Sequence, residues 1–201
     1  MFADASSRLN HVHMDAPFND FGRQPLLPRK LSGLGPGVCW ADVNRDGAED
    51  LIIVGGKGGR TTIFHNDLKG GFTEQANAPG SKGNPRDQTS VLMWRGSDGA
   101  SSLLTGESNW EDADTNAPPI RVQPLPGNTG ASQAAVLGDG RSSVGPLAMA
   151  DVDGDSLPEV FAGGRVVAGR YPEAASSYLL RWDGKNFRVL QAFSGLGLVS
   201  G

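Results

Sequence analysis

The sequence predicts an all-β fold, and three observations support this prediction. Glycine supplies 29 and proline 13 of the 201 residues, which is a composition rich in turns. No segment keeps an apolar period of 3.6 residues over about 12 positions, so almost no helix is expected. Short apolar runs instead alternate with turn-forming stretches, as they do in chains of short antiparallel strands.

Two stretches of the chain resemble each other closely. One is GVCWADVNRDGAEDLIIVGG at residues 37–56, and the other is GPLAMADVDGDSLPEVFAGG at residues 145–164. Each has an apolar run, an acidic loop, and a second apolar run that ends in glycines. A weaker copy without most of the acids, VLMWRGSDGASSLLTGES, lies midway between them at residues 91–108. This spacing predicts an internal repeat of about 54 residues.

Each full copy is followed by a predicted hairpin, TTIFHNDLKGGFTE in the first and SYLLRWDGKNFRVL in the third. Four-stranded units that recur every 40–55 residues are typical of β-propellers. We therefore expect a partial propeller of four-stranded blades at residues 37–86, 87–140 and 141–193. Residues 1–36 are expected to form an N-terminal strand and connector, and residues 194–201 the start of a fourth blade.

Three blades do not close a ring, because closed propellers have at least about four. The sequence therefore predicts that further blades complete the ring. They would come either from a longer chain or from a second copy.

The acidic loops at residues 42–50 and 151–159 carry oxygen side chains at positions 1, 3, 5 and 9. Calcium is bound by six to eight oxygens from carboxylates, amides, carbonyls and water, so this spacing predicts two Ca²⁺ sites. Position 7 offers only its backbone carbonyl, and Gly47 or Ser156 stands at the sharp turn in position 6. The expected ligands are Asp42, Asn44, Asp46, Ala48 (carbonyl) and Asp50 in the first loop, and Asp151, Asp153, Asp155, Leu157 (carbonyl) and Glu159 in the second.

An EF-hand and a plain acidic turn are the alternatives to this interpretation. An EF-hand needs an acid at position 12 and flanking helices, but position 12 is Ile53 or Ala162 and the flanks read as strands. Aspartates also favour turns without any metal, although the same spacing in two equivalent places argues against chance. The weaker copy has Gly96, Asp98, Ala100 and Leu104 in place of the acids, and we expect it to bind no calcium.

Asp42, Asn44, Asp46, Gly47 and Asp50, followed by the LIIV run and glycines, resemble the calcium loops of FG-GAP/VCBS repeats. FNDFGRQPLLPRKLSGLGPGVCWADV (residues 18–43) and GGRVVAGRYPEAASSYLLRWDG (residues 163–184) resemble, more narrowly, the ASPIC/UnbV-associated group of secreted repeat proteins. This resemblance implies a β-propeller of the integrin α-chain kind, with the calcium ligands given above. It also implies an extracellular or periplasmic location, although no signal peptide is recognisable in these residues.

Two other candidate sites stand outside the acidic loops. His11, His13 and Asp15 would share one face of a strand and could hold a transition metal, although exposed or locally bonded histidines explain the pattern as well. Trp110 lies among the acids of residues 107–119 and could contact a sugar or a protein if it were exposed. The other interpretation is a solvated loop.

Composition limits the remaining function classes. The net charge is −4 with no basic patch, so nucleic acid is not an expected partner. No apolar run is long enough to span a membrane, Cys39 stands alone, and no catalytic motif is present. We expect a calcium-stabilised extracellular scaffold for adhesion or for protein or carbohydrate recognition. An enzyme that acts on polysaccharide and a self-assembling structural subunit are the alternatives.

Overall fold

The computed structural model describes residues 4, 6–96, 99–125, 140–184 and 186–193, and it is all-β as predicted. The described residues form eleven strands and two short helical turns, the 3₁₀ turn Ser6–Arg8 and α1 at Asp20–Arg23. None of the described helices is long and apolar enough to cross a membrane.

The strands form three antiparallel sheets that follow one another along the chain. The first sheet holds β1 (Val38–Ala41), β2 (Asp50–Ile53), β3 (Thr62–Asn66) and β4 (Phe72–Glu74). The second holds β5 (Gln88–Arg95), β6 (Ser101–Glu107) and β7 (Ile120–Pro124). The third holds β8 (Ser142–Ala150), β9 (Glu159–Val167), β10 (Ser177–Trp182) and β11 (Phe187–Phe193).

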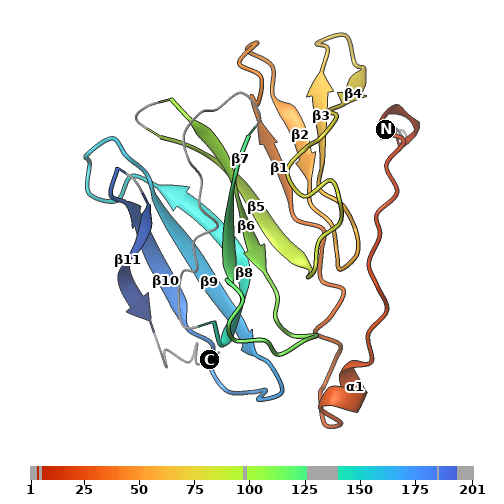
Figure 1. Cartoon of the computed structure of the whole chain (residues 1–201), viewed down its shortest axis with the longest axis vertical. Coiled ribbons are helices and arrows are strands. Elements are labelled where there is room, and N and C mark those ends of the chain that lie inside the picture. Colours follow the sequence, from red (N-terminus) through yellow and green to blue (C-terminus); the bar gives the residue numbers. More distant parts are fainter. Residues whose placement is uncertain (1–3, 5, 97–98, 126–139, 185, 194–201) are drawn as a thin grey trace.

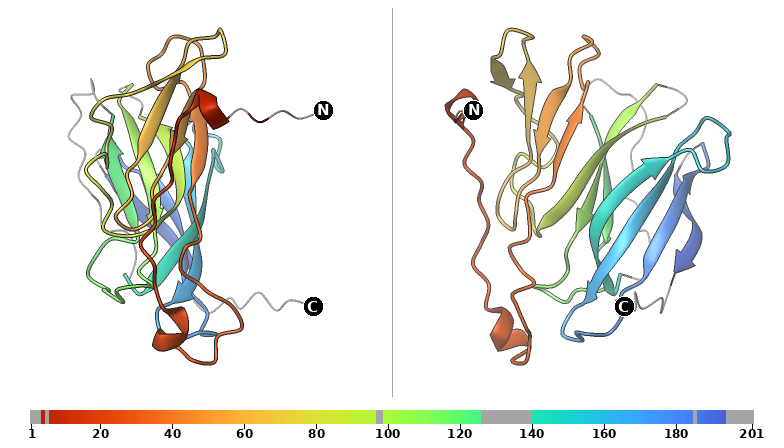
Figure 2. Two further views of the ribbon diagram at one scale, coloured as in Figure 1. Left: turned by 90° about the vertical axis from the view of Figure 1, so that its right-hand side faces the viewer. Right: turned by 180° about the vertical axis from the view of Figure 1, so that it is seen from behind.

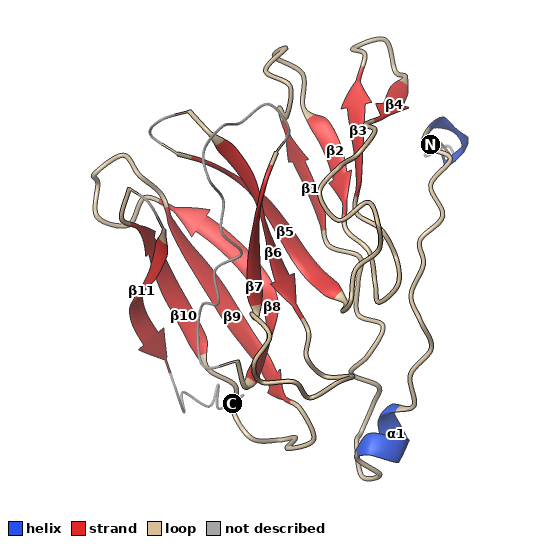
Figure 3. Ribbon diagram, viewed as in Figure 1, coloured by secondary structure: helices blue, strands red, loops and turns tan. Residues whose placement is uncertain are grey.

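The three sheets lie side by side in chain order, with the second sheet between the other two (Figures 1 and 2). β5 contacts β1 on one side and β8 on the other. The connections β1–β2, β5–β6 and β8–β9 leave the sheets at the upper edge in Figure 3, and α1 lies at the opposite edge. We call these the upper and the lower edge below.

Apolar residues fill both spaces beside the second sheet, because neighbouring residues of a strand point to opposite faces. Leu103 of β6 packs with Ile52 and Ile63 of the first sheet. Leu104, the next residue, packs with Val160 and Leu180 of the third sheet. Every residue of β6 is buried as a result, and the middle sheet anchors the two outer ones.

Three details differ from the sequence-based expectation or lie beyond the described residues. Among the described residues before Val38 there is no strand, so the expected N-terminal strand within residues 1–36 is absent there. The second sheet has three described strands rather than four, and residues 126–139, where the fourth was expected, lie outside the described residues. Residues 194–201, the expected start of another blade, also lie outside them.

Candidate metal centres

The β1–β2 loop at residues 42–50 is closed by hydrogen bonds from backbone N–H groups to its acidic side chains. The Asp46 and Gly47 N–H groups donate to the two Asp42 carboxylate oxygens, each at 3.1 Å. The Ala48 N–H donates to Asp46 Oδ1 at 2.8 Å. This bond and the Asn44 side chain hold the pKa of Asp46 below its ordinary value, which keeps the carboxylate ionised.

The β8–β9 loop at residues 151–159 repeats most of this hydrogen-bond pattern, but the N–H of position 4 takes the place of the N–H of position 5 as one donor to the first acid. The Gly154 and Ser156 N–H groups donate to the two Asp151 oxygens at 2.7 and 2.9 Å. The Leu157 N–H donates to Asp155 Oδ1 at 2.8 Å, as the Ala48 N–H does to Asp46. The two loops therefore share one backbone shape.

The acid at position 9 of each loop is buried. Asp50 is 0% and Glu159 is 1% exposed, whereas the other acids of the loops are partly or fully exposed. In each loop, one oxygen of this acid accepts a hydrogen bond from the residue at position 2, Val43 or Val152, at 3.0 Å. The position-9 carboxylate thus fastens the start of the loop to the strand that follows it.

The two loops differ in the positive group that faces this buried acid. His65 Nδ1 of β3 lies 3.1 Å from Asp50 Oδ2, and the histidine is charged only when protonated. Arg181 of β10 stands at the matching place, with Nε 2.8 Å from Glu159 Oε1. The Arg181 guanidinium also forms ion pairs with Asp153 and Asp155.

The expected calcium ligands come together to different degrees. Asp151, Asp153 and Glu159 place one carboxylate oxygen each within 4.8 Å of the others. Among the described residues, the carboxylates of the first loop do not form such a group of three; its position 3 is Asn44 instead of an acid, and Asp50 contacts His65 and Asn66. The structure does not test the Ala48 and Leu157 carbonyls as ligands, and Asp98 of the weaker copy lies outside the described residues.

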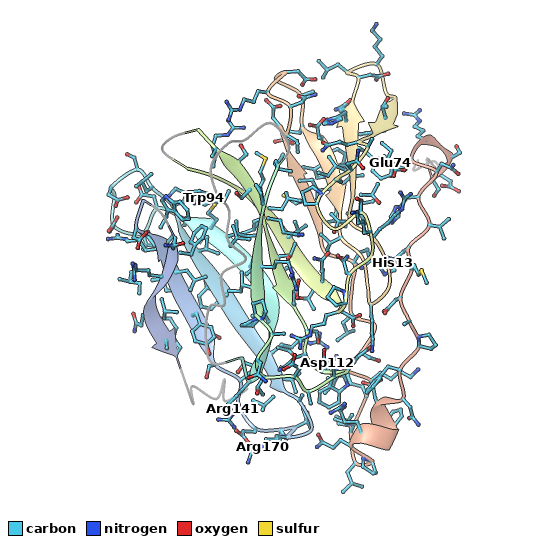
Figure 4. The ribbon with its side chains drawn as sticks, in the orientation of Figure 1. His13, Glu74, Trp94, Asp112, Arg141 and Arg170 are labelled. Carbon is cyan, nitrogen blue, oxygen red and sulfur yellow. The ribbon has the colours of Figure 1, made fainter. Side chains whose placement is uncertain are left out.

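A second group of three carboxylates lies toward the lower edge of the sheets and was not predicted. It joins Asp15 of the N-terminal segment, Asp87 just before β5, and Glu111 of the β6–β7 connection, all within 4.8 Å of one another. Asp112, the neighbour of Glu111, marks this region in Figure 4. Motif spacing could not find a site made from three distant segments. Gly56 is one faint sign of this site in the sequence. A Cβ atom at this position would stand 2.5 Å from Asp15 Cγ, so a larger residue would leave no room for the Asp15 carboxylate.

Both interpretations of Trp110, as part of a solvated loop and as an exposed contact for a sugar or a protein, are wrong for this side chain. Its side chain is completely buried and packs against Leu27, Leu31 and Val166. The indole Nε1 donates to Asp20 Oδ1 at 2.7 Å. Since the anchoring carboxylate lies 90 residues away in the sequence, local composition could not predict this burial.

His11 and His13 do not gather with Asp15 around a common point among the described residues, where Asp15 lies with other carboxylates instead. The two histidine rings are 6.5 Å apart, and His11 lies edge-on to Phe64. Burial and the neighbouring His13 lower the pKa of His11. His11 therefore serves as a packing residue over the outer face of the first sheet.

A comparison of the chain with models of protein families finds no match, and a search of curated proteins finds no relative. The residues and their geometry are therefore the basis for inferring the function.

Proposed function

We propose that this chain is a calcium-stabilised β-propeller scaffold that works outside the cell or in the periplasm, in adhesion or in recognition of a protein or carbohydrate. The observation that carries the proposal is the shared construction of the two acidic loops. Both orient their carboxylates by the same backbone hydrogen bonds, although only some of their residues are identical. The donor set consists of oxygens, which suits a hard cation such as calcium.

The charge of the loops supports a bound cation. The first loop holds four acids and the second also holds four, within nine residues each. Carboxylates this close repel one another unless a positive charge lies between them. Calcium at a hundredfold excess over its dissociation constant would stabilise the fold by about 2.7 kcal/mol per site.

The row of three sheets supports the propeller part of the proposal. The outer face of β1 exposes Val38 (53%) and Trp40 (50%), and the far face of the third sheet exposes Phe161. Large apolar side chains on such faces are typical of surfaces that another element covers. Further blades, from a longer chain or a second copy, would cover both faces.

The test is thermal unfolding of the chain in EDTA, followed by calcium titration at constant pH. We expect the melting temperature to rise and saturate with calcium, and to respond less to magnesium. Asp46→Asn and Asp155→Asn should each weaken the response. Asp98→Asn in the weaker copy is the matched control and should leave it unchanged. A melting temperature that does not respond to calcium would refute the calcium part of the proposal.

The exposed faces also favour one alternative, a subunit that assembles with copies of itself. Light scattering over a range of concentrations distinguishes this self-assembling subunit from the scaffold. If the mass of the unmodified protein rises with concentration, and the Trp40→Ser variant stays monomeric, the assembly subunit is favoured over the scaffold.

A further inference from the structure

The described part of the chain contains a carboxylate cluster whose charges the protein does not balance. Asp15, Asp87 and Glu111 bring three carboxylates together at the side of the sheets opposite the acidic loops. Lys57 Nζ lies 3.3 Å from Glu111 Oε2 and supplies one positive charge, and the Lys57 N–H donates to Asp87 Oδ1 at 2.9 Å. Arg165 and His13 also act electrostatically on Asp87 and Asp15, but among the described residues only Lys57 forms an ion pair with the cluster.

The cluster also leaves buried oxygens without hydrogen bonds. The Glu111 side chain is 6% exposed, and its Oε1 atom has no hydrogen-bond partner. Asp15 Oδ1 is likewise buried and has none. A buried polar atom that is left unsatisfied costs about 1–3 kcal/mol, and more when it is charged. Both of these carboxylates belong to the same group of three, so one ligand at the cluster could satisfy them together.

We propose that Asp15, Asp87 and Glu111 form a further binding site for a hard divalent cation such as calcium. Two oxygens on one calcium ion are at most about 4.6–5.2 Å apart, since each bond is about 2.3–2.6 Å long. The three carboxylate oxygens lie within 4.8 Å of one another, so one calcium ion between them could reach all three. Asp15, Asp87 and Glu111 provide oxygen ligands only, which excludes a preference for softer metals.

The enclosure of the cluster favours an ion over a larger ligand. Asp87 is 5% exposed, so a sugar chain could not approach these carboxylates without displacing the N-terminal segment. Burial and the nearby Asp87 charge raise the pKa values of Asp15 and Glu111, which shows that the repulsion and burial outweigh the nearby positive groups. A small cation removes this repulsion and needs no open cleft.

A cation at this site would connect the N-terminal segment, which belongs to none of the described sheets, to the paired ends of β5 and β6. Asp15 belongs to the N-terminal segment, Asp87 precedes the middle sheet, and Glu111 lies in the connection from β6 to β7. The ion would hold the N-terminal segment against the sheets, where the Ala16 N–H already donates to the Lys57 carbonyl at 3.0 Å. This role does not depend on calcium in the acidic loops.

Equilibrium dialysis of the whole chain against about 1 mM calcium, with the bound metal measured by mass spectrometry, tests the proposal. Glu111→Gln and Asp15→Asn should each bind one calcium ion fewer per chain than the unmodified protein. Asp15→Asn changes only the N-terminal segment, so it remains informative if Glu111→Gln fails to fold. Circular dichroism verifies the fold of each variant.

Asp112→Asn is the matched control, because it removes the same charge at the adjacent position and should keep the full calcium content. If the folded variants at Asp15 or Glu111 bind as much calcium as the unmodified protein, the proposal is wrong. The proposal is also wrong if Asp112→Asn loses an equal amount of calcium. Loop variants such as Asp46→Asn test the acidic loops separately, so failure of one proposal leaves the other standing.

Discussion

The loops at residues 42–50 and 151–159 share most of their backbone hydrogen bonds but have different electrostatic surroundings. In the first loop the buried acid Asp50 meets His65. In the second loop Glu159 meets Arg181, which also reaches Asp153 and Asp155. The buried acid of the second loop therefore has a permanent cation beside it, whereas Asp50 faces a histidine that is charged only when protonated. The residues of each loop determine its backbone shape. The positive group that faces its buried acid comes from a later strand, β3 for the first loop and β10 for the second.

This comparison predicts that the second loop depends on Arg181 when calcium is absent. Arg181→Met removes the positive charge and leaves Glu159 buried without its partner, so we expect a loss of about 3 kcal/mol in EDTA. Calcium should restore most of this loss, because it can occupy the position of the guanidinium. Urea unfolding with and without calcium measures both quantities.

Arg188→Met is the control for this variant. Arg188 is an exposed arginine that pairs with Asp183 outside the acidic loops, and exposed pairs contribute less than about 1 kcal/mol. An Arg181→Met variant that loses the same stability in EDTA and in calcium would contradict the comparison. In that case the arginine would act through packing alone.

Asp20 sharpens the comparison, because it is a buried carboxylate satisfied without any cation. It accepts hydrogen bonds from Ser32, Leu31 and Trp110. Burial alone would raise its pKa, but these bonds hold the pKa of Asp20 below the ordinary 3.8. We expect Asp20→Asn to lose about 2 kcal/mol at neutral pH, equally with calcium and with EDTA.

The pH dependence of Asp20 follows from the sign of its shift. A carboxylate with a lowered pKa in the folded state contributes stability above pH 3.8, and this contribution disappears as the pH falls through the folded pKa. The difference between the unmodified protein and Asp20→Asn should therefore shrink below about pH 4. Urea unfolding at a series of pH values measures it, and a difference that grows on acidification would contradict the assignment.

Exchanging the two positive residues tests the comparison directly. His65→Arg places a permanent cation beside Asp50 and should weaken calcium binding by the first loop about tenfold, or about 1.4 kcal/mol. Arg181→His should strengthen binding by the second loop by a similar factor. Calorimetric titration measures both affinities. Unchanged affinities in both variants would show that the neighbouring strand does not influence the loops.

The sequence predicted the features that depend on local spacing. The acidic loops, the strands on both sides of them and the scarcity of helix follow from alternation and turn residues, so they could be read directly. It did not predict Arg181 opposite Glu159, because that pairing needs the register of β9 and β10. The burial of Trp110 and the cluster around Glu111 depend on contacts between distant segments, which leave no periodic pattern.

The smallest predicted effect concerns a backbone difference between the two loops. Position 6 has a positive φ in both, 87° at Gly47 and 69° at Ser156, and glycine adopts this conformation without a steric penalty. Ser156→Gly should therefore stabilise the protein by about 0.5 kcal/mol, after allowing for the greater freedom of glycine in the unfolded chain. The mirror variant Gly47→Ser should cost about 1 kcal/mol. Urea unfolding in EDTA measures both, and effects of the same sign would show that the loops differ in backbone shape as well as in charge.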